Sequence, residues 1–184
     1  IQDEEVWVLD RTNNNILNNQ NAQGTIPQIA DIIALTDLGE YDRMVNTNPL
    51  YQPNPADQVY DIYGKPLPTN STNKLLTEIL NPADTAYTLN KDQVVNYLET
   101  KFGLVQGRDF VRVRARKLRK DEYFIHRKLG FISLNAQLQP DQVVGISYRY
   151  AYNGNDSLKI GQVTTENNAG NRVVYVKMLK GSTQ

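Results

Sequence analysis

Residues 143–165 read VVGISYRYAYNGNDSLKIGQVTT and give the strongest indication of how the chain folds. Apolar and polar side chains alternate through residues 143–152 and again through residues 158–165, which is the period of a half-buried β-strand. Asn153 and Gly154 lie between the two runs, and this dipeptide readily adopts the positive φ angles of a hairpin turn. We therefore predict an antiparallel hairpin with a slightly long loop.

Other short alternating runs occur from Arg108 onward and near the start of the chain. Those beyond Arg108 are residues 110–113, 123–125, 131–134 and 173–178. Residues 5–10 (EVWVLD) predict another strand, and the asparagine-rich residues 13–21 predict a polar loop after it. Residues 31–38 (DIIALTDL) favour a strand through their β-branched content, although Ile29, Ile32 and Ile33 also fit one helical face.

Six prolines interrupt residues 46–90, namely Pro49, Pro53, Pro55, Pro66, Pro68 and Pro82. Proline at this density blocks helices and strand ladders, so we expect an extended segment over the surface of the core. Residues 74–80 (KLLTEIL) nevertheless predict a short helix. A second helix is predicted from Asn90, a good N-cap residue, to Phe102, with Gly103 ending it.

These patterns predict the α+β class: an antiparallel β-sheet or small sandwich with two short helices and a long proline-rich surface segment. A length of 184 residues is typical of about one domain. We interpret residues 1–184 as a single module. It comprises N-terminal strands in residues 1–45, a proline-rich loop with helices in 46–107, and an antiparallel β region in 108–184.

Composition argues against most kinds of chemistry. Lys plus Arg and Asp plus Glu both total 20, so no overall field attracts nucleic acid. The absence of cysteine excludes disulfides and thiolate sites, and a single histidine, His126, excludes multi-histidine metal sites. We predict no enzyme activity, cofactor or metal. We also predict no direct membrane span, because no apolar run reaches the roughly 18 residues of a membrane helix.

An ordered set of motifs resembles the SprA family, the outer-membrane channels of type IX secretion and gliding motility in Bacteroidetes. The set within residues 115–154 comprises Ala-Arg-Lys-Leu at 115–118, Glu-Tyr at 122–123, Leu-Gly-Phe-Ile-Ser-Leu-Asn at 129–135, Pro-Asp at 140–141 and Tyr-Ala-Tyr-Asn-Gly at 150–154. Similar motifs elsewhere are Val-Trp-Val at 6–8, Ala34 with Asp-Leu-Gly-Glu at 37–40, Ile-Gly at 160–161 and Val-Lys-Met-Leu-Lys at 176–180. Residues 47–90 match the family least.

The resemblance implies a non-catalytic extramembrane module of such a channel, acting in pore capping or in contact with a partner or cargo. The implied partners are the rest of a large outer-membrane barrel, a PorV-like shuttle, a plug protein or secreted cargo. The implied location is the outer membrane, with this soluble part on the cell surface in preference to the periplasmic face. The family supplies no catalytic or ligand-binding residue to carry over.

Two groups of side chains are candidate partner surfaces. Strand alternation places Arg112, Arg114 and Arg116 on one face, which favours a solvated sheet face or contact with an acidic partner. Alternation also places three tyrosines on one face, namely Tyr148, Tyr150 and Tyr152. Packing is the favoured interpretation of this stripe, and the alternative is a cell-surface adhesion or glycan-binding module in which tyrosines stack on sugars.

Two tripeptides resemble the Asp-(Ser/Thr)-apolar sites of O-glycosylation in Bacteroidetes. They are Asp84-Thr85-Ala86 and Asp156-Ser157-Leu158, which make Thr85 and Ser157 the candidate attachment residues. Attachment requires accessible chain, and both residues lie in predicted loops.

Overall fold

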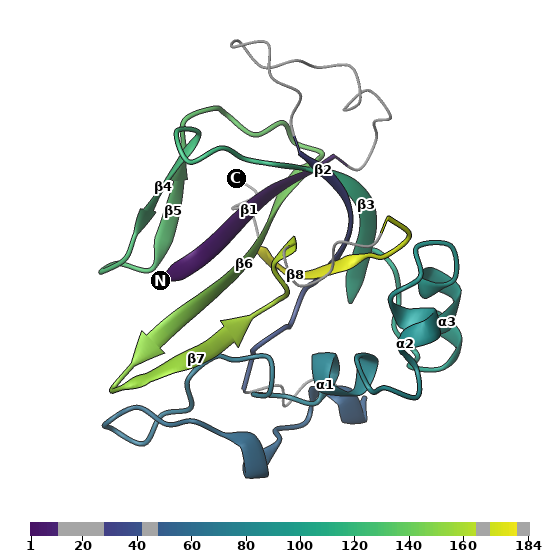
Figure 1. Cartoon of the computed structure of the whole chain (residues 1–184), viewed down its shortest axis with the longest axis horizontal. Coiled ribbons are helices and arrows are strands. Elements are labelled where there is room, and N and C mark those ends of the chain that lie inside the picture. Colours follow the sequence, from purple (N-terminus) through teal and green to yellow (C-terminus); the bar gives the residue numbers. More distant parts are fainter. Residues whose placement is uncertain (11–27, 42–47, 165–169, 180–184) are drawn as a thin grey trace.

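The computed structural model describes residues 1–10, 28–41, 48–164 and 170–179. Figure 1 shows a β-barrel with a two-stranded hairpin on one side and short helices on the other. Residues 13–21, predicted as a loop, lie outside the described residues, as do Thr165 and Lys180.

Five strands form the barrel, in the spatial order β1-β3-β2-β8-β6. They are β1 (Gln2–Asp10), β2 (Ile29–Leu35), β3 (Phe110–Lys117), β6 (Gln142–Tyr152) and β8 (Val174–Leu179). Pairing of β6 with β1 closes the barrel. Strands β2 and β8 are parallel, and the other pairings are antiparallel.

The prediction of an antiparallel sheet or small sandwich is therefore wrong in two respects, since the sheet closes on itself and contains a parallel pair. Local alternation identifies strands but does not say which distant strands pair. Within the described ranges the fold is mostly β, with a few short helices. The strand interpretation of residues 31–38 is confirmed by β2 for residues 31–35, while residues 36–38 form a turn.

Alternate residues of the five strands fill the barrel interior with apolar side chains. The fully or nearly fully buried members are Trp7, Leu9, Ile32, Ala34, Val111, Ala115, Val174, Val176 and Met178. Gly145 on β6 faces this interior, where a Cβ atom would lie 2.7 Å from Val176 Cγ2 and 3.0 Å from Leu9 Cδ1. Glycine therefore allows β6 to approach the packed interior closely.

A buried carboxylate, Glu5, occupies one end of the barrel. Its Oε1 accepts hydrogen bonds from Lys117 Nζ at 3.0 Å and from Thr164 Oγ1 at 2.7 Å. The backbone N–H of Thr164 also donates to Oε2, at 3.1 Å. A buried charge requires such partners, so this cluster ties β1 and β3 to the chain that follows the β6–β7 hairpin.

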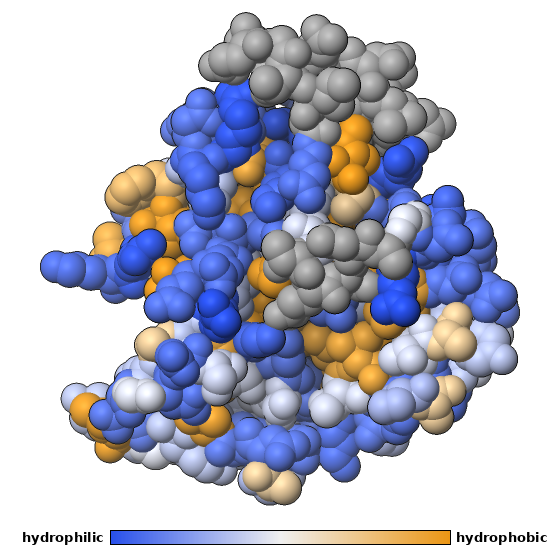
Figure 2. Space-filling model, viewed as in Figure 1, coloured by the Kyte–Doolittle hydropathy of each residue, from blue (hydrophilic) through white to orange (hydrophobic). Residues whose placement is uncertain are grey.

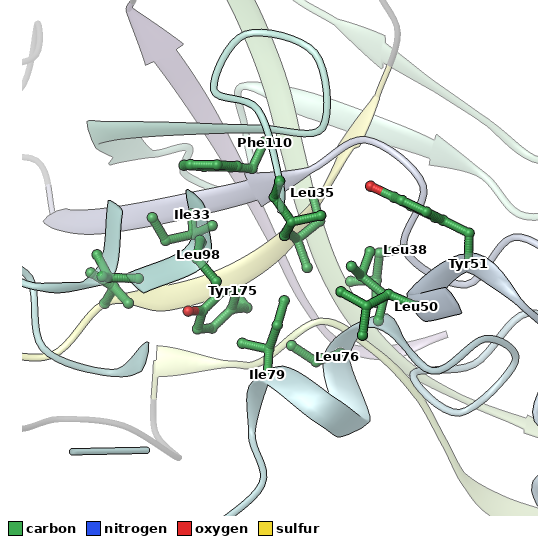
Figure 3. Close-up of a cluster of buried hydrophobic side chains, with 14 of the residues drawn as sticks. Ile33, Leu35, Leu38, Leu50, Tyr51, Leu76, Ile79, Leu98, Phe110 and Tyr175 are labelled. Atoms are coloured by element: carbon green, nitrogen blue, oxygen red, sulfur yellow. The ribbon is translucent and has the colours of Figure 1, made fainter. Parts of the chain in front are cut away.

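A second core lies between the outer face of the barrel and the helical segments (Figure 3). Those segments are the 3₁₀ turn Pro49–Tyr51 and the helices α1 (Leu75–Ile79), α2 (Thr85–Thr88) and α3 (Val94–Thr100). A further 3₁₀ turn, Pro55–Asp57, has no buried residue. Tyr175 of β8 is buried in the second core and donates its hydroxyl to Thr88 O at 2.6 Å, and burial raises the pKa of Tyr175. Leu50 and Tyr51 are also buried in this core, so the proline-rich segment does not merely cover the surface.

The first predicted helix is confirmed by α1, and the second begins later than predicted. Asn90 Oδ1 accepts from Asp92 N at 2.9 Å, and α3 begins only at Val94. Gly103 has φ +66°, as expected of a residue that ends a helix. The four-residue helix α2 was not predicted because so short a segment contains no helical period.

The predicted hairpin is present as β6 and β7 (Asn155–Ile160). Asn153 (φ 48°) and Gly154 (φ 82°) form the turn. Because Tyr152 pairs with Asn155, the loop is tighter than predicted. Strand β7 ends at Ile160, where Gly161 with φ +71° redirects the chain.

Candidate functional site

The β4–β5 hairpin forms a separate two-stranded sheet beside the barrel (Figure 1). Strand β4 (Tyr123–His126) pairs antiparallel with β5 (Phe131–Leu134). The hairpin's inward side chains pack with β1 and β6 in a third apolar cluster. The members of that cluster include Tyr123, Ile125, Ile132, Leu134, Val6, Val144 and Ile146. The hairpin is thus held on the barrel by one of its two faces.

The opposite face and the turn of the hairpin expose apolar side chains to solvent. The exposed fractions are 61% for Phe124, 74% for Leu129 and 47% for Phe131. The His126 ring stacks on Phe131 with centroids 4.1 Å apart and meets Phe124 edge-on at 4.7 Å. We call these four residues the hairpin surface, and Figure 2 shows hydrophobic atoms over this side of the molecule, at left.

An open groove of about 730 Å³ runs beside β4. Its walls are Glu4, Lys120 and every residue from 123 to 129. Since successive strand residues point to opposite faces, a groove touched by all of them must follow the edge of the strand. No residue of β5 lines the groove, so it follows the edge of β4 that faces away from β5.

Positive charge predominates around the groove. Lys120 Nζ lies 2.9 Å from Glu4 Oε1 and donates to Glu4 O at 3.0 Å. Burial opposes ionisation of Glu4, but hydrogen bonds and the charge of Lys120 outweigh it and lower the pKa of Glu4. Arg127 and Lys128 are exposed and make no ion pair with any described residue. One carboxylate therefore faces three cations.

Glu122 anchors the base of the hairpin. Arg116 Nη1 donates to its two carboxylate oxygens at 2.9 and 3.0 Å, and the Arg119 N–H donates to Oε2 at 2.7 Å. Burial alone would raise the pKa of Glu122. The hydrogen bonds and the charges of Arg116 and Arg119 lower it by a larger amount, so the net shift of the pKa is downward. The backbone carbonyl of Glu122 also accepts from Asn135 N at 2.9 Å, which extends the β4–β5 pairing.

The three predicted arginines lie on the outer face of the barrel, close to carboxylates. Arg112 and Arg114 lie 3.5 and 4.0 Å from Asp31 Oδ1, and Arg116 pairs with Glu122. Their charge is therefore partly balanced within the chain. Their use as a partner surface stays a prediction.

The predicted tyrosines face the proline-rich segment. The Tyr150 hydroxyl donates to Pro68 O at 2.6 Å, and the Tyr152 hydroxyl accepts from Ile62 N at 3.0 Å. Burial, together with Tyr148, raises the pKa of Tyr150 to about 12. These contacts hold the proline-rich segment against the β6–β7 hairpin, and glycan binding by the stripe stays a prediction.

The two candidate glycosylation residues do not lie in loops, so that structural prediction is wrong. Thr85 is the first residue of α2, and its Oγ1 lies 3.3 Å from Pro82 O. Ser157 lies in β7, is exposed, and donates its hydroxyl to Asn155 Oδ1 at 2.8 Å. Each tripeptide is also too short to specify a loop. Modification at either residue stays a prediction.

The described part of the chain does not gather side chains of the kinds that act in catalysis or bind a metal ion. His126 Nε2 lies 2.8 Å from Ser133 Oγ, but the two belong to a solvent-facing strand pair whose rings stack. No cluster of three or more histidine, aspartate or glutamate side chains among the described residues could hold a metal ion. No helix among them is long and apolar enough to cross a membrane.

Sequence reasoning missed the exposed residues Phe124, Leu129 and Phe131. The available signal was that residues 123–125 are apolar at every position, so the strand has no polar face. One face of such a strand packs on the core, and the other remains uncovered. The sequence matches no protein-family model and no curated protein.

Proposed function

We propose that this chain is a non-catalytic extramembrane module of a SprA-like outer-membrane protein-secretion channel. In this role it caps the pore or contacts a shuttle, a plug protein or secreted cargo. Such a role depends on a stable framework and an accessible surface rather than on a reactive group.

The location of the SprA-like motifs supports the proposal. Val-Trp-Val at 6–8 belongs to β1, and the motifs at 115–154 extend from the end of β3 through the β4–β5 hairpin to β6. The motif at 176–180 includes most of β8. The resemblance therefore concerns the strands that build the barrel and its hairpin.

The single observation that carries the proposal is the exposed hairpin surface. The rings of Phe124, His126 and Phe131 contact one another, and the exposed Leu129 lies along the same groove as Phe124 and His126. Contiguous exposed apolar groups with a polar rim mark interaction sites, because water contact with them is unfavourable. Arg127 and Lys128 provide part of that rim.

The size and location of the native polypeptide test the proposal. Antibodies raised against this chain are expected to detect, in the bacterium that carries the gene, a polypeptide many times longer than the chain in the outer-membrane fraction. Blotting of fractionated cells against an inner-membrane marker and a periplasmic marker measures this. A short polypeptide, or one confined to another fraction, would contradict the proposal.

A further inference from the structure

The groove beside β4 combines an open strand edge, apolar walls and a local excess of positive charge. On this basis we propose that the groove binds an extended segment of a partner protein, in which acidic and apolar residues alternate, as an additional strand on β4. The inference deepens the proposed function and rests on it for the identity of the partner as a translocon component or cargo.

The backbone of β4 has hydrogen-bonding groups that β5 does not use. Gly130 N donates to His126 O, and Asn135 N donates to Glu122 O, so these two carbonyls point toward the β5 side. In an antiparallel ladder, residues alternate between bonding to the partner strand and pointing away from it. Tyr123 and Ile125 therefore direct their N–H and C=O groups away from β5, into the groove.

An unpaired strand edge is a template for another strand. Proteins commonly protect such edges with charge, proline or covering chain. Here the edge is bordered by a groove whose walls include the side chains of Tyr123, Phe124, Ile125 and Leu129. A partner strand would bond to the backbone of β4 and place its apolar side chains against these walls, which is the mode of β-strand addition.

Charge identifies the chemistry of the occupant. Lys120, Arg127 and Lys128 surround the groove, and Glu4 balances only one of them through its pair with Lys120. A strand with carboxylates beside its apolar residues complements this arrangement, and a basic strand does not. Anionic lipid could use the same cations, but the groove is concave and follows a strand edge, which favours an extended peptide.

The binding test uses the whole chain and the probe peptide acetyl-Glu-Val-Glu-Ile-Glu-Val-Glu-amide. Titration calorimetry measures affinity, and amide hydrogen exchange followed by NMR locates the contact. Binding is expected to slow the exchange of the Tyr123 and Ile125 amides. The amides of Phe124 and His126, which already bond to β5, are expected to change little.

Two controls separate this mode from non-specific attraction. The peptide with lysine in place of every glutamate is expected not to bind. The double variant Arg127→Glu with Lys128→Glu is expected to weaken binding of the acidic peptide by about tenfold, because two attractive contacts become repulsive. The matched double variant Lys65→Glu with Lys74→Glu reverses two exposed lysines outside the groove and is expected to bind as the parent chain does.

Several results would overturn the inference. In the calorimetry, these are a failure of the acidic peptide to bind, or equal binding of the acidic and the lysine peptides. In the hydrogen exchange, they are protection of all four β4 amides or of none. Among the variants, the contradicting result is an equal loss of affinity in both double variants. Binding to phosphatidylglycerol vesicles without binding to the peptide would also overturn it, in favour of a lipid contact. If the peptide fails while the native polypeptide is very large and in the outer membrane, only the inference fails. If the peptide binds while the native polypeptide is short, only the proposed channel function fails.

Discussion

Individual residues show that the barrel interior is tightly filled with side chains. The interior is filled from all five strands, and the only tryptophan, Trp7, is fully buried there. Gly145 has the side chains of Val176 and Leu9 directly above it. Since protein interiors are close-packed, a single added methyl group at this position has no free volume to occupy.

Replacement of Gly145 by alanine tests this packing. The new Cβ would lie 2.7 Å from Val176 Cγ2, so the strands must shift, and we expect a loss of about 1–3 kcal/mol in the free energy of unfolding. Urea unfolding followed by Trp7 fluorescence measures the loss. Gly170→Ala is the control, because a Cβ there meets nothing within 4 Å and should change stability by less than about 0.5 kcal/mol. Equal stability of the two variants would show that the interior is looser than described.

At the scale of elements, the β4–β5 hairpin depends on both apolar packing and a charged anchor. Its inward face packs on β1 and β6, while Glu122 binds Arg116 and the Arg119 backbone at its base. Because β1 pairs with β3 and β6 within the barrel, and β6 pairs with β1, β7 and β8, the hairpin packs on two strands that belong to the main sheet. Its outward face is thereby held toward solvent.

Glu122→Gln tests the anchor through its pH dependence. The pKa of Glu122 is lowered below its ordinary value of 4.5 in the folded chain, so the ionised group stabilises the fold above that pH. This stabilisation is lost as the pH falls through the folded-state pKa. We expect Glu122→Gln to be about 1 kcal/mol less stable at pH 7, and the difference should shrink as the pH falls below 4.5.

Urea unfolding at a series of pH values measures both effects. The control is Glu99→Gln, since Glu99 is exposed on α3 and no ion pair forms to it within the described part of the chain. A difference between Glu122→Gln and the parent that stays constant down to low pH would contradict an electrostatic anchor.

The elements themselves were more predictable than their arrangement. Period-two alternation identified β1, β6 and β8 because each has one face in the barrel interior. Barrel closure was not predictable because it depends on pairs between distant segments, β1 with β6 and β2 with β8. The hairpin surface was missed because alternation assumes a polar outer face, and residues 123–125 have none.

In the molecule as a whole, the described apolar side chains pack in three clusters that stabilise the fold. The exposed hairpin surface belongs to none of the three. The chain carries no net charge, so recognition must rely on local patches such as the cations around the β4 groove. A barrel that presents an apolar strand pair offers a partner a defined contact surface, which is consistent with the channel module proposed above.

Secretion by cells that carry the changed gene is the decisive measurement for the proposed function of the hairpin surface. The double variant Phe124→Ser with Leu129→Ser removes exposed apolar side chains, and the control Ile62→Ser with Tyr63→Ser removes two others that are 71% and 88% exposed on the proline-rich segment. If the proposed channel function holds, the first variant lowers the amount of secreted protein in the medium while the native polypeptide keeps its normal level in the outer-membrane fraction, and the control secretes normally. Normal secretion by the hairpin variant, or an equal loss in both variants, would contradict the account.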